Sequence, residues 1–230
     1  MSNIPEIIQS LKKQLQESGD PESISAMAKF GITPEQTYGV KIPRLRAIAK
    51  NYRKNHELAL ALWQINNRET RILAAMIDDP KQLTEEQMEA WAMKFDYWEI
   101  CDQVCMNLYE KHPLAWPKAI EWSGHENEGK KRAAFVLMAR LAVSEKKAPN
   151  DRFEPFFPLI LRESTDERNL VKKAVNWALR QIGKRNRALN RKAILDAEKI
   201  ATLDSKSARW IATDALRELR GDAVQKRLKI

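Results

Sequence analysis

The sequence predicts an all-α fold built from repeated helix pairs, on three observations. Alanine, leucine, lysine, arginine and glutamate, which all favour helices, dominate the 230 residues. No segment alternates between polar and apolar residues for long enough to indicate a half-buried strand. Seven glycines and ten prolines are too few for a β-sandwich rich in tight turns or for a disordered chain.

Helix signals follow one another along the chain. Pro5 lies where a helix can begin, and an apolar stripe at helical spacing follows it: Ile7, Ile8, Leu11 and Leu15. Pro43 opens a further helix, and Thr84 with Gln87 three residues later has the pattern of a capping box. Breaks are expected at four proline steps: Asp79–Pro80, His112–Pro113, Trp116–Pro117 and Ala148–Pro149.

A basic residue followed by small and apolar residues recurs at Arg71–Met76, Lys131–Val136, Lys172–Trp177 and Ala208–Ala212. The steps from Arg132 to Lys173 and from Lys173 to Arg209 are 41 and 36 residues, and the 61 residues from Arg71 to Arg132 count as two steps. Such periods are typical of stacked helix pairs of the HEAT or armadillo kind. We therefore expect residues 1–230 to form a single α-helical repeat domain, a solenoid with a concave basic face. The alternative is a generic helical bundle with basic helix ends.

Positive charge indicates the kind of partner. The formal net charge of +9 favours a polyanion, either nucleic acid or an anionic membrane surface. Between Arg168 and Lys192 there are nine Lys or Arg residues and no Asp or Glu. This basic run predicts a phosphate-binding stripe, and a solvated basic surface is the alternative.

Other features exclude several classes of protein. Cys101 and Cys105 are too few for a disulfide scaffold and lack a nearby His for zinc, so we expect buried thiols. Scattered histidines and the lack of a Gly-rich phosphate loop predict no metal site and no nucleotide hydrolysis. No secretion signal and no long apolar stretch is present, so we expect a location in the cytoplasm or on the nucleoid and no membrane partner. We also expect a monomer that needs no cofactor.

Trp98 and Asp102 are the residues most indicative of chemistry. They lie four residues apart on a predicted helix, so the indole and the carboxylate project from the same face. A carboxylate beside an aromatic ring suits a flat guest with positive charge. For a basic protein, such a guest is most naturally a damaged base in nucleic acid.

Several motifs resemble those of the AlkD-type DNA-alkylation-repair glycosylases. These are Tyr97–Asp102, Lys131–Ala134 and Lys173–Arg180, and Tyr38–Arg46 is similar to that family's amino-terminal segment. The resemblance runs from about Ala26 to Leu219 and rests on the order and spacing of the motifs. It implies a helical solenoid that grips duplex DNA and excises cationic alkylated purines, such as 7-alkylguanine and 3-alkyladenine, without a pocket for a flipped base.

The resemblance also assigns individual residues. Asp102 matches the catalytic carboxylate, and Trp98 and Trp177 match two tryptophans that pack around the sugar and backbone of the lesion. Arg132 matches an arginine in the same cleft. Phe30 aligns with a family tyrosine, so it keeps the ring and loses the hydroxyl. Arg180 is expected to contact a phosphate, and further DNA contacts are expected from Lys131, Lys172, Lys173, Lys184 and Arg185.

The chemistry of cationic purines agrees with this assignment. Such a base leaves as a neutral molecule and needs no general acid, so the rate depends on stabilising positive charge on the deoxyribose. Asp102 can do so, and it can position a water for attack on the anomeric carbon. No lysine is distinctive as a nucleophile, so a monofunctional glycosylase is expected.

Each assignment has a structural alternative. Trp98 and Trp177 can be core residues. Core or groove packing is expected for the other five tryptophans: Trp63, Trp91, Trp116, Trp122 and Trp210. Asp102 can form a salt bridge with Arg132, which would also keep the carboxylate ionised. Two other functions stay open: a non-catalytic DNA-binding repeat protein that recognises branched or distorted DNA, and a scaffold for another protein. The glycosylase is favoured by the presence of the four residues that match the family's cleft: Trp98, Asp102, Arg132 and Trp177. Phe30 argues mildly against it.

Overall fold

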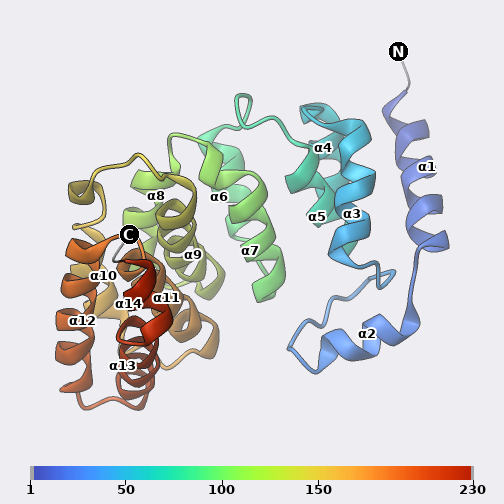
Figure 1. Ribbon diagram of the computed structural model, residues 1–230. Helices are drawn as coiled ribbons and strands as arrows, with labels where there is room; N and C mark the ends of the chain where they lie inside the picture. The colour runs from blue at the N-terminus through green and yellow to red at the C-terminus, as the bar shows by residue number, and fades with distance from the viewer. Residues whose placement is uncertain (1–2, 229–230) are drawn as a thin grey trace. The chain divides into compact units, whose positions relative to one another are not determined.

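The computed structural model describes residues 3–228, and helices make up all of the regular secondary structure in that range (Figure 1). Contacts divide the chain at the His112–Pro113 step into two compact units, called here the first and the second unit. The prediction of a single domain over residues 1–230 stays a prediction. Among the described helices, none has the length and apolarity that crossing a bilayer requires.

The first unit contains seven α-helices and two 3₁₀ turns within its described part. They are α1 (Ile4–Glu17), α2 (Pro21–Ala28), α3 (Ile42–Ala49), η1 (Lys50–Tyr52), α4 (His56–Trp63), α5 (Arg68–Ile77), α6 (Glu85–Ala92), α7 (Trp98–Asn107) and η2 (Tyr109–Lys111). Here α5 packs against α4, α3 and α7. The Trp63 and Trp91 rings stack with centroids 4.0 Å apart, which joins α4 to α6.

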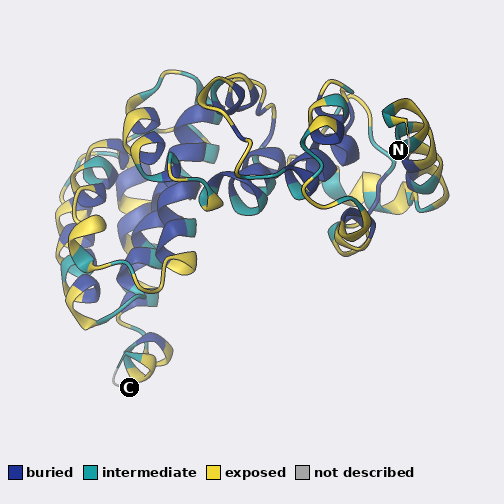
Figure 2. Cartoon of the chain, turned by 90° about the horizontal axis from the view of Figure 1, so that it is seen from above, coloured by how far each residue is buried: buried dark blue, intermediate teal, exposed yellow. Residues whose placement is uncertain are grey.

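The second unit contains seven further α-helices and two 3₁₀ turns within its described part. They are α8 (Ala115–Glu121), η3 (Trp122–Gly124), α9 (Glu128–Ser144), η4 (Asn150–Arg152), α10 (Phe156–Glu163), α11 (Asn169–Gly183), α12 (Arg187–Ala201), α13 (Lys206–Leu219) and α14 (Asp222–Arg227). Its core lies around α9 and α11, which pack along each other, and α13 packs against α11. Figure 2 shows buried residues concentrated on these inner helices and exposed residues on the outer ones.

The local signals explain where most helices begin. Pro5 and Pro43 lie in the first turns of α1 and α3, where a missing N–H costs no intrahelical bond. Thr84 caps α6 by accepting a hydrogen bond from the Gln87 N–H at 3.2 Å. The expected break at Trp116–Pro117 is wrong, because Pro117 lies in the first turn of α8, where proline is tolerated.

Successive helices confirm the predicted repeat. Helices α5, α7, α9, α11 and α13 begin 30, 30, 41 and 37 residues apart, so each repeat contributes one such helix. Of the two positions expected for Trp210, core or groove packing, the structure excludes the core. Its side chain is 41% exposed, because it lies on the face of α13 opposite the buried Ile211 and Ala215, and the Lys172 ammonium lies 5.2 Å from its ring centroid.

Candidate active site

Trp98 and Phe30 lie together in the first unit. Trp98 is the first residue of α7, and its indole Nε1 donates a hydrogen bond to the Phe30 carbonyl at 2.9 Å. Phe30 follows α2, and its own side chain is 71% exposed. The chain therefore holds an exposed aromatic ring beside the partly exposed indole of Trp98, although 68 residues separate the two.

A buried carboxylate fixes the segment that follows Phe30. Glu69, at the start of α5, accepts hydrogen bonds from the Thr37 hydroxyl at 2.8 Å, the Tyr38 N–H at 3.0 Å and the Val40 N–H at 3.1 Å. Its side chain is fully buried. Because a buried charge is costly unless it is paired and hydrogen-bonded, these bonds hold the segment in one conformation. Gly39 has φ +78°, and a Cβ there would lie 2.3 Å from the Asp20 carbonyl oxygen, so this turn requires glycine.

A second buried ion pair fixes the first turn of α7. The Arg68 guanidinium makes two hydrogen bonds of 2.7 Å to the Glu99 carboxylate, and it also donates to Glu69 at 2.8 Å. Arg68 and Glu99 are both buried. The planar fork of arginine matches a carboxylate in this two-bond geometry. The residue before Trp98, Tyr97, is also buried, and burial raises the pKa of its phenol. Trp98 therefore projects from a rigidly held helix end.

Asp102 lies one turn further along α7, on the same face as Trp98. Asp102 is buried, with 9% of the residue exposed. The neighbouring Cys101 and Cys105 are both buried thiols, as expected. Within either unit taken alone, the described residues hold no group of three His, Cys, Asp or Glu side chains close enough to share a metal ion.

In the second unit, the start of α9 carries Lys131 and Arg132, both buried. The Lys131 ammonium lies 2.6 Å from Glu163 and 3.2 Å from Asp166, so two carboxylates already occupy it. Arg132 donates to the Leu170 carbonyl at 2.6 Å. Burial would raise the pKa of Asp166, but Arg168 and Lys131 outweigh that effect and lower it.

Helix α11 carries an aromatic side chain between cations. Lys173, Trp177, Arg180 and Lys184 are spaced three and four residues apart, which places them on one face. The Gln181 amide, turned so that its oxygen faces both donors, accepts from Trp177 Nε1 at 3.0 Å and from Lys184 at 3.3 Å. Trp177 is partly exposed, and Lys173 is exposed.

Carboxylates from α13 neutralise much of this stripe. Glu218 lies 2.6 Å from both Arg180 and Lys184, and Asp214 lies 3.3 Å from Arg180. Burial would raise the pKa of Glu218, but the two cations outweigh that effect and lower it. The basic run therefore contains no Asp or Glu in the sequence, but in the folded protein some of its cations pair with carboxylates of another helix. This neutralisation was not visible in the sequence, because the partners lie 34 and 38 residues further along.

Two other predicted cations are engaged differently. Arg185 donates to the Ala142 carbonyl at 2.7 Å and the Ala148 carbonyl at 3.0 Å, at the end of α9 and just beyond it. This geometry satisfies carbonyls that a helix end leaves unpaired, and burial lowers the pKa of Arg185. The Lys172 ammonium lies over the ring of Trp210. Of the seven predicted DNA-binding residues, Lys173 and Phe30 are the exposed ones.

Sequence reasoning also missed a group of basic residues in the first unit. Arg46, Lys50 and Arg53 follow one another at intervals of four and three residues along α3 and η1, and Lys111 ends η2. All four line one cleft, which also contains Lys54. The helical spacing of Arg46, Lys50 and Arg53 was the available signal.

Comparison with known proteins places this all-helical arrangement in a class. A solved structure, described as a new family of proteins related to the HEAT-like repeat DNA glycosylases with affinity for branched DNA structures, matches with a TM-score of 0.78. It is 18% identical and covers 96% of this chain and 95% of its own. The protein thus has the fold of a HEAT-like helical-repeat protein, as predicted.

Sequence comparison then identifies the family. Residues 11–219 match the profile of the family described as DNA alkylation repair enzyme, and the chain belongs to that family. Two curated relatives are uncharacterized proteins, Lmo0209 of Listeria monocytogenes serovar 1/2a and Lin0241 of Listeria innocua serovar 6a. Each is 33% identical over 88 residues, which span 37% of this chain and 39% of the relative.

Proposed function

We propose that this protein is a monofunctional glycosylase that excises cationic alkylated purines from duplex DNA. The observation that carries the proposal is a nearly buried carboxylate, Asp102, one turn from a partly exposed tryptophan on a helix whose first turn is held by a buried ion pair. Membership of the DNA alkylation repair enzyme family supports DNA as the partner.

The proposed chemistry follows from the charge of the lesion. A purine alkylated at N3 or N7 is a cation and departs as a neutral base, so positive charge develops on the deoxyribose. A carboxylate held in place stabilises that charge without having to reorganise during the reaction. The rings of Trp98 and Trp177 would each add cation–π attraction of roughly 0.5–2 kcal/mol. An uncharged base would leave poorly from such a site.

The remaining site residues would hold the DNA. Lys173 presents an exposed cation beside Trp177 on α11. Arg132 is proposed to take part in recognising the lesion, as the family resemblance implies. Lys131, Arg180 and Lys184 already contact carboxylates, so their binding to phosphate requires exchange of these partners. We infer that their larger contribution is to position α9 and α11.

Release of 7-methylguanine from a duplex with one such lesion tests the proposal. The parent protein should release the base, and Asp102→Asn should lower the single-turnover rate by on the order of 10²–10³-fold, because it removes the stabilising charge. Duplex affinity should change little. Asp151→Asn, which removes an exposed carboxylate on η4, serves as the matched control and should keep the parent rate.

A second candidate is a DNA-binding protein without catalysis. It is favoured by Phe30, which lacks the hydroxyl of the family tyrosine, and by the structural relative described as having affinity for branched DNA. A four-way junction and a linear duplex of equal length, titrated side by side, separate the two. No base release by parent or variant, with the junction bound at least tenfold more tightly, would replace the enzyme with this candidate.

A further inference from the structure

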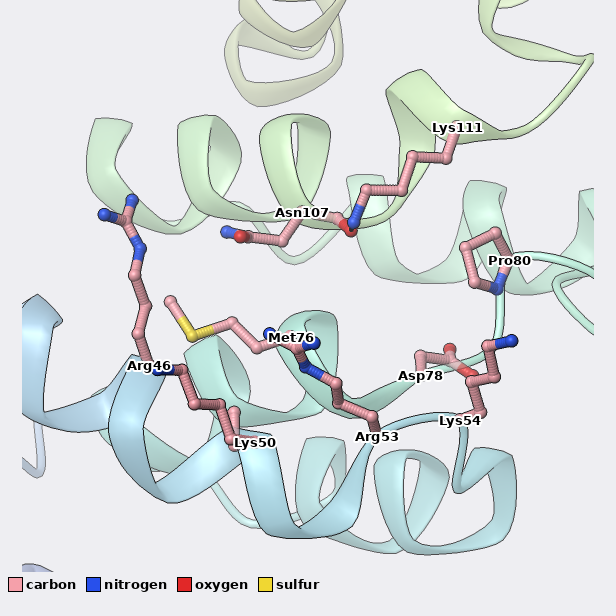
Figure 3. Close-up of a pocket in the computed structure, with 10 residues that line it drawn as sticks. Arg46, Lys50, Arg53, Lys54, Met76, Asp78, Pro80, Asn107 and Lys111 are labelled. Atoms are coloured by element: carbon pink, nitrogen blue, oxygen red, sulfur yellow. Dashed lines mark hydrogen bonds between the residues drawn. The ribbon is translucent and has the colours of Figure 1, made fainter.

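The first unit contains a cleft of about 510 Å³, and five of its ten lining residues are cationic (Figure 3). Its walls come from α3 and η1, the end of α5 and the end of α7 with η2. In Figure 3, Arg53 and Lys111 reach into the same space from opposite walls. Its five basic residues, called here the basic cleft, are Arg46, Lys50, Arg53, Lys54 and Lys111.

The positive charge of the basic cleft is not neutralised by ion pairs. Within residues 3–228, none of its five cations lies within ion-pair distance of a carboxylate. Asp78 is the single acidic residue of the lining. Its fully buried carboxylate is 2.7 Å from His56 Nδ1 and 2.7 Å from Gln87 Nε2. Those two side chains contact both oxygens of the carboxylate, and the ion pair that Asp78 makes is with His56 and not with a cation of the cleft.

The lining also places cations in unfavourable surroundings. Burial and the Arg53 charge lower the pKa of Lys111 against the opposing effect of Glu110. The Lys111 ammonium also donates to the Asn107 carbonyl at the negative end of α7, an interaction that favours the cation and offsets part of this cost. Lys54 adopts φ +62°, a conformation that residues other than glycine rarely take and that clusters at functional sites. A bound anion would relieve the repulsion among these groups.

We infer that the basic cleft binds a phosphodiester group of the DNA backbone, as an anchoring point separate from Trp98 and Asp102. This inference rests on the proposed function in taking DNA as the partner. Helix α7 links the two places, because Trp98 begins it and Asn107 ends it. Nine residue steps at 1.5 Å correspond to about 14 Å, a span over which one strand of B-DNA carries roughly four phosphates, about 3.4 Å apart along the axis. A duplex with a nucleotide at Trp98 can therefore present a phosphate to the cleft.

Salt dependence of duplex binding tests the inference. Fluorescence anisotropy with an unmodified 20-base-pair duplex, between about 50 and 200 mM salt, gives the slope of log K against log salt concentration. Arg53→Gln with Lys111→Gln should reduce the slope by about 0.9 for each phosphate that is no longer neutralised and weaken binding at least fivefold. Lys12→Gln with Lys13→Gln removes the same charge from the exposed side of α1 and should keep the parent slope.

The outcomes separate this inference from the proposed function and from a free anion site. A cleft variant with the parent's slope and affinity, and with unchanged circular dichroism, overturns the inference. Inorganic phosphate that raises the Tm of the parent but not of the variant, with duplex binding equal in both, also overturns it in favour of a free phosphate site. A reduced slope in the variant supports the inference even if the parent releases no 7-methylguanine, in which case the glycosylase proposal alone fails.

Discussion

Phe30 has the largest exposed fraction of the large hydrophobic residues in the described part of the chain, at 71%. Because this aromatic ring is exposed, it contributes little hydrophobic stabilisation to the fold and is available for contact with a partner. Its position is held by its backbone, since the Trp98 indole binds the Phe30 carbonyl and not the side chain. The ring can therefore change without disturbing the Trp98 contact.

Replacement of this ring should affect DNA binding and leave folding unchanged. Phe30→Ala should lower duplex affinity by on the order of tenfold, since stacking of an aromatic side chain on a base contributes roughly 1–3 kcal/mol. Phe30→Tyr retains the ring and should keep the parent affinity, and a faster release of 7-methylguanine would show that a hydroxyl is useful there. Equal affinity of Phe30→Ala and the parent, with a lowered Tm, would instead make Phe30 a structural residue.

At the scale of elements, the first turn of α7 depends on α5. Arg68 contacts Glu99 on α7, Glu69 on α5 and the Val40 carbonyl at 2.9 Å. Through these bonds one guanidinium joins α5, α7 and the segment before α3. The direction in which Trp98 and Asp102 project is thus set by charges inside the first unit.

Removal of one partner from this ion pair should be costly. Glu99→Ala leaves the buried Arg68 with a single carboxylate, and we expect the free energy of unfolding to fall by about 3 kcal/mol, measured by urea denaturation. Glu17→Ala, which breaks the exposed 4.0 Å pair with Lys13, should change it by less than about 1 kcal/mol. A decrease below about 1 kcal/mol in Glu99→Ala would show that α7 is held chiefly by apolar packing.

For the whole molecule, the balance of charge governs both binding and acid stability. The net charge of +9 favours association with a polyanion at long range. Three of the nine cations of the basic run, Arg168, Arg180 and Lys184, are paired with Asp166, Asp214 or Glu218. The cations of the basic cleft have no such pairs among the described residues. The attraction between these carboxylates and their cations contributes to folding only while the carboxylates are ionised.

The lowered pKa of Asp166 sets the direction of a pH effect. A carboxyl whose pKa is lower in the folded state stabilises the fold above its unfolded pKa of about 3.9, and this contribution is lost as the pH falls through the folded value. The Tm difference between the parent and Asp166→Asn should therefore be present at pH 6 and shrink below about pH 4. A difference that stays constant down to pH 3 would mean that Asp166 stabilises the fold by hydrogen bonding alone.

Local patterns in the sequence were enough for the helices, their repeat and the family. Prolines at helix starts, the Thr84 cap and the spacing of basic and small residues act within one or two turns, so neighbours in sequence decide them. The pair Trp98 and Asp102 shares a face for the same reason. Their assigned roles come from family motifs and stay a proposal.

Contacts between distant segments decided the rest. The neutralisation of Arg180 by α13, the Trp98 bond to Phe30 and the basic cleft between residues 46–54 and Lys111 each join positions at least 30 residues apart. The strength of an electrostatic interaction depends on distance in space and on burial, and neither quantity follows from the order of residues. The sequence therefore located the positive charge, while packing of the helices determined which cations are paired and which are left for a ligand.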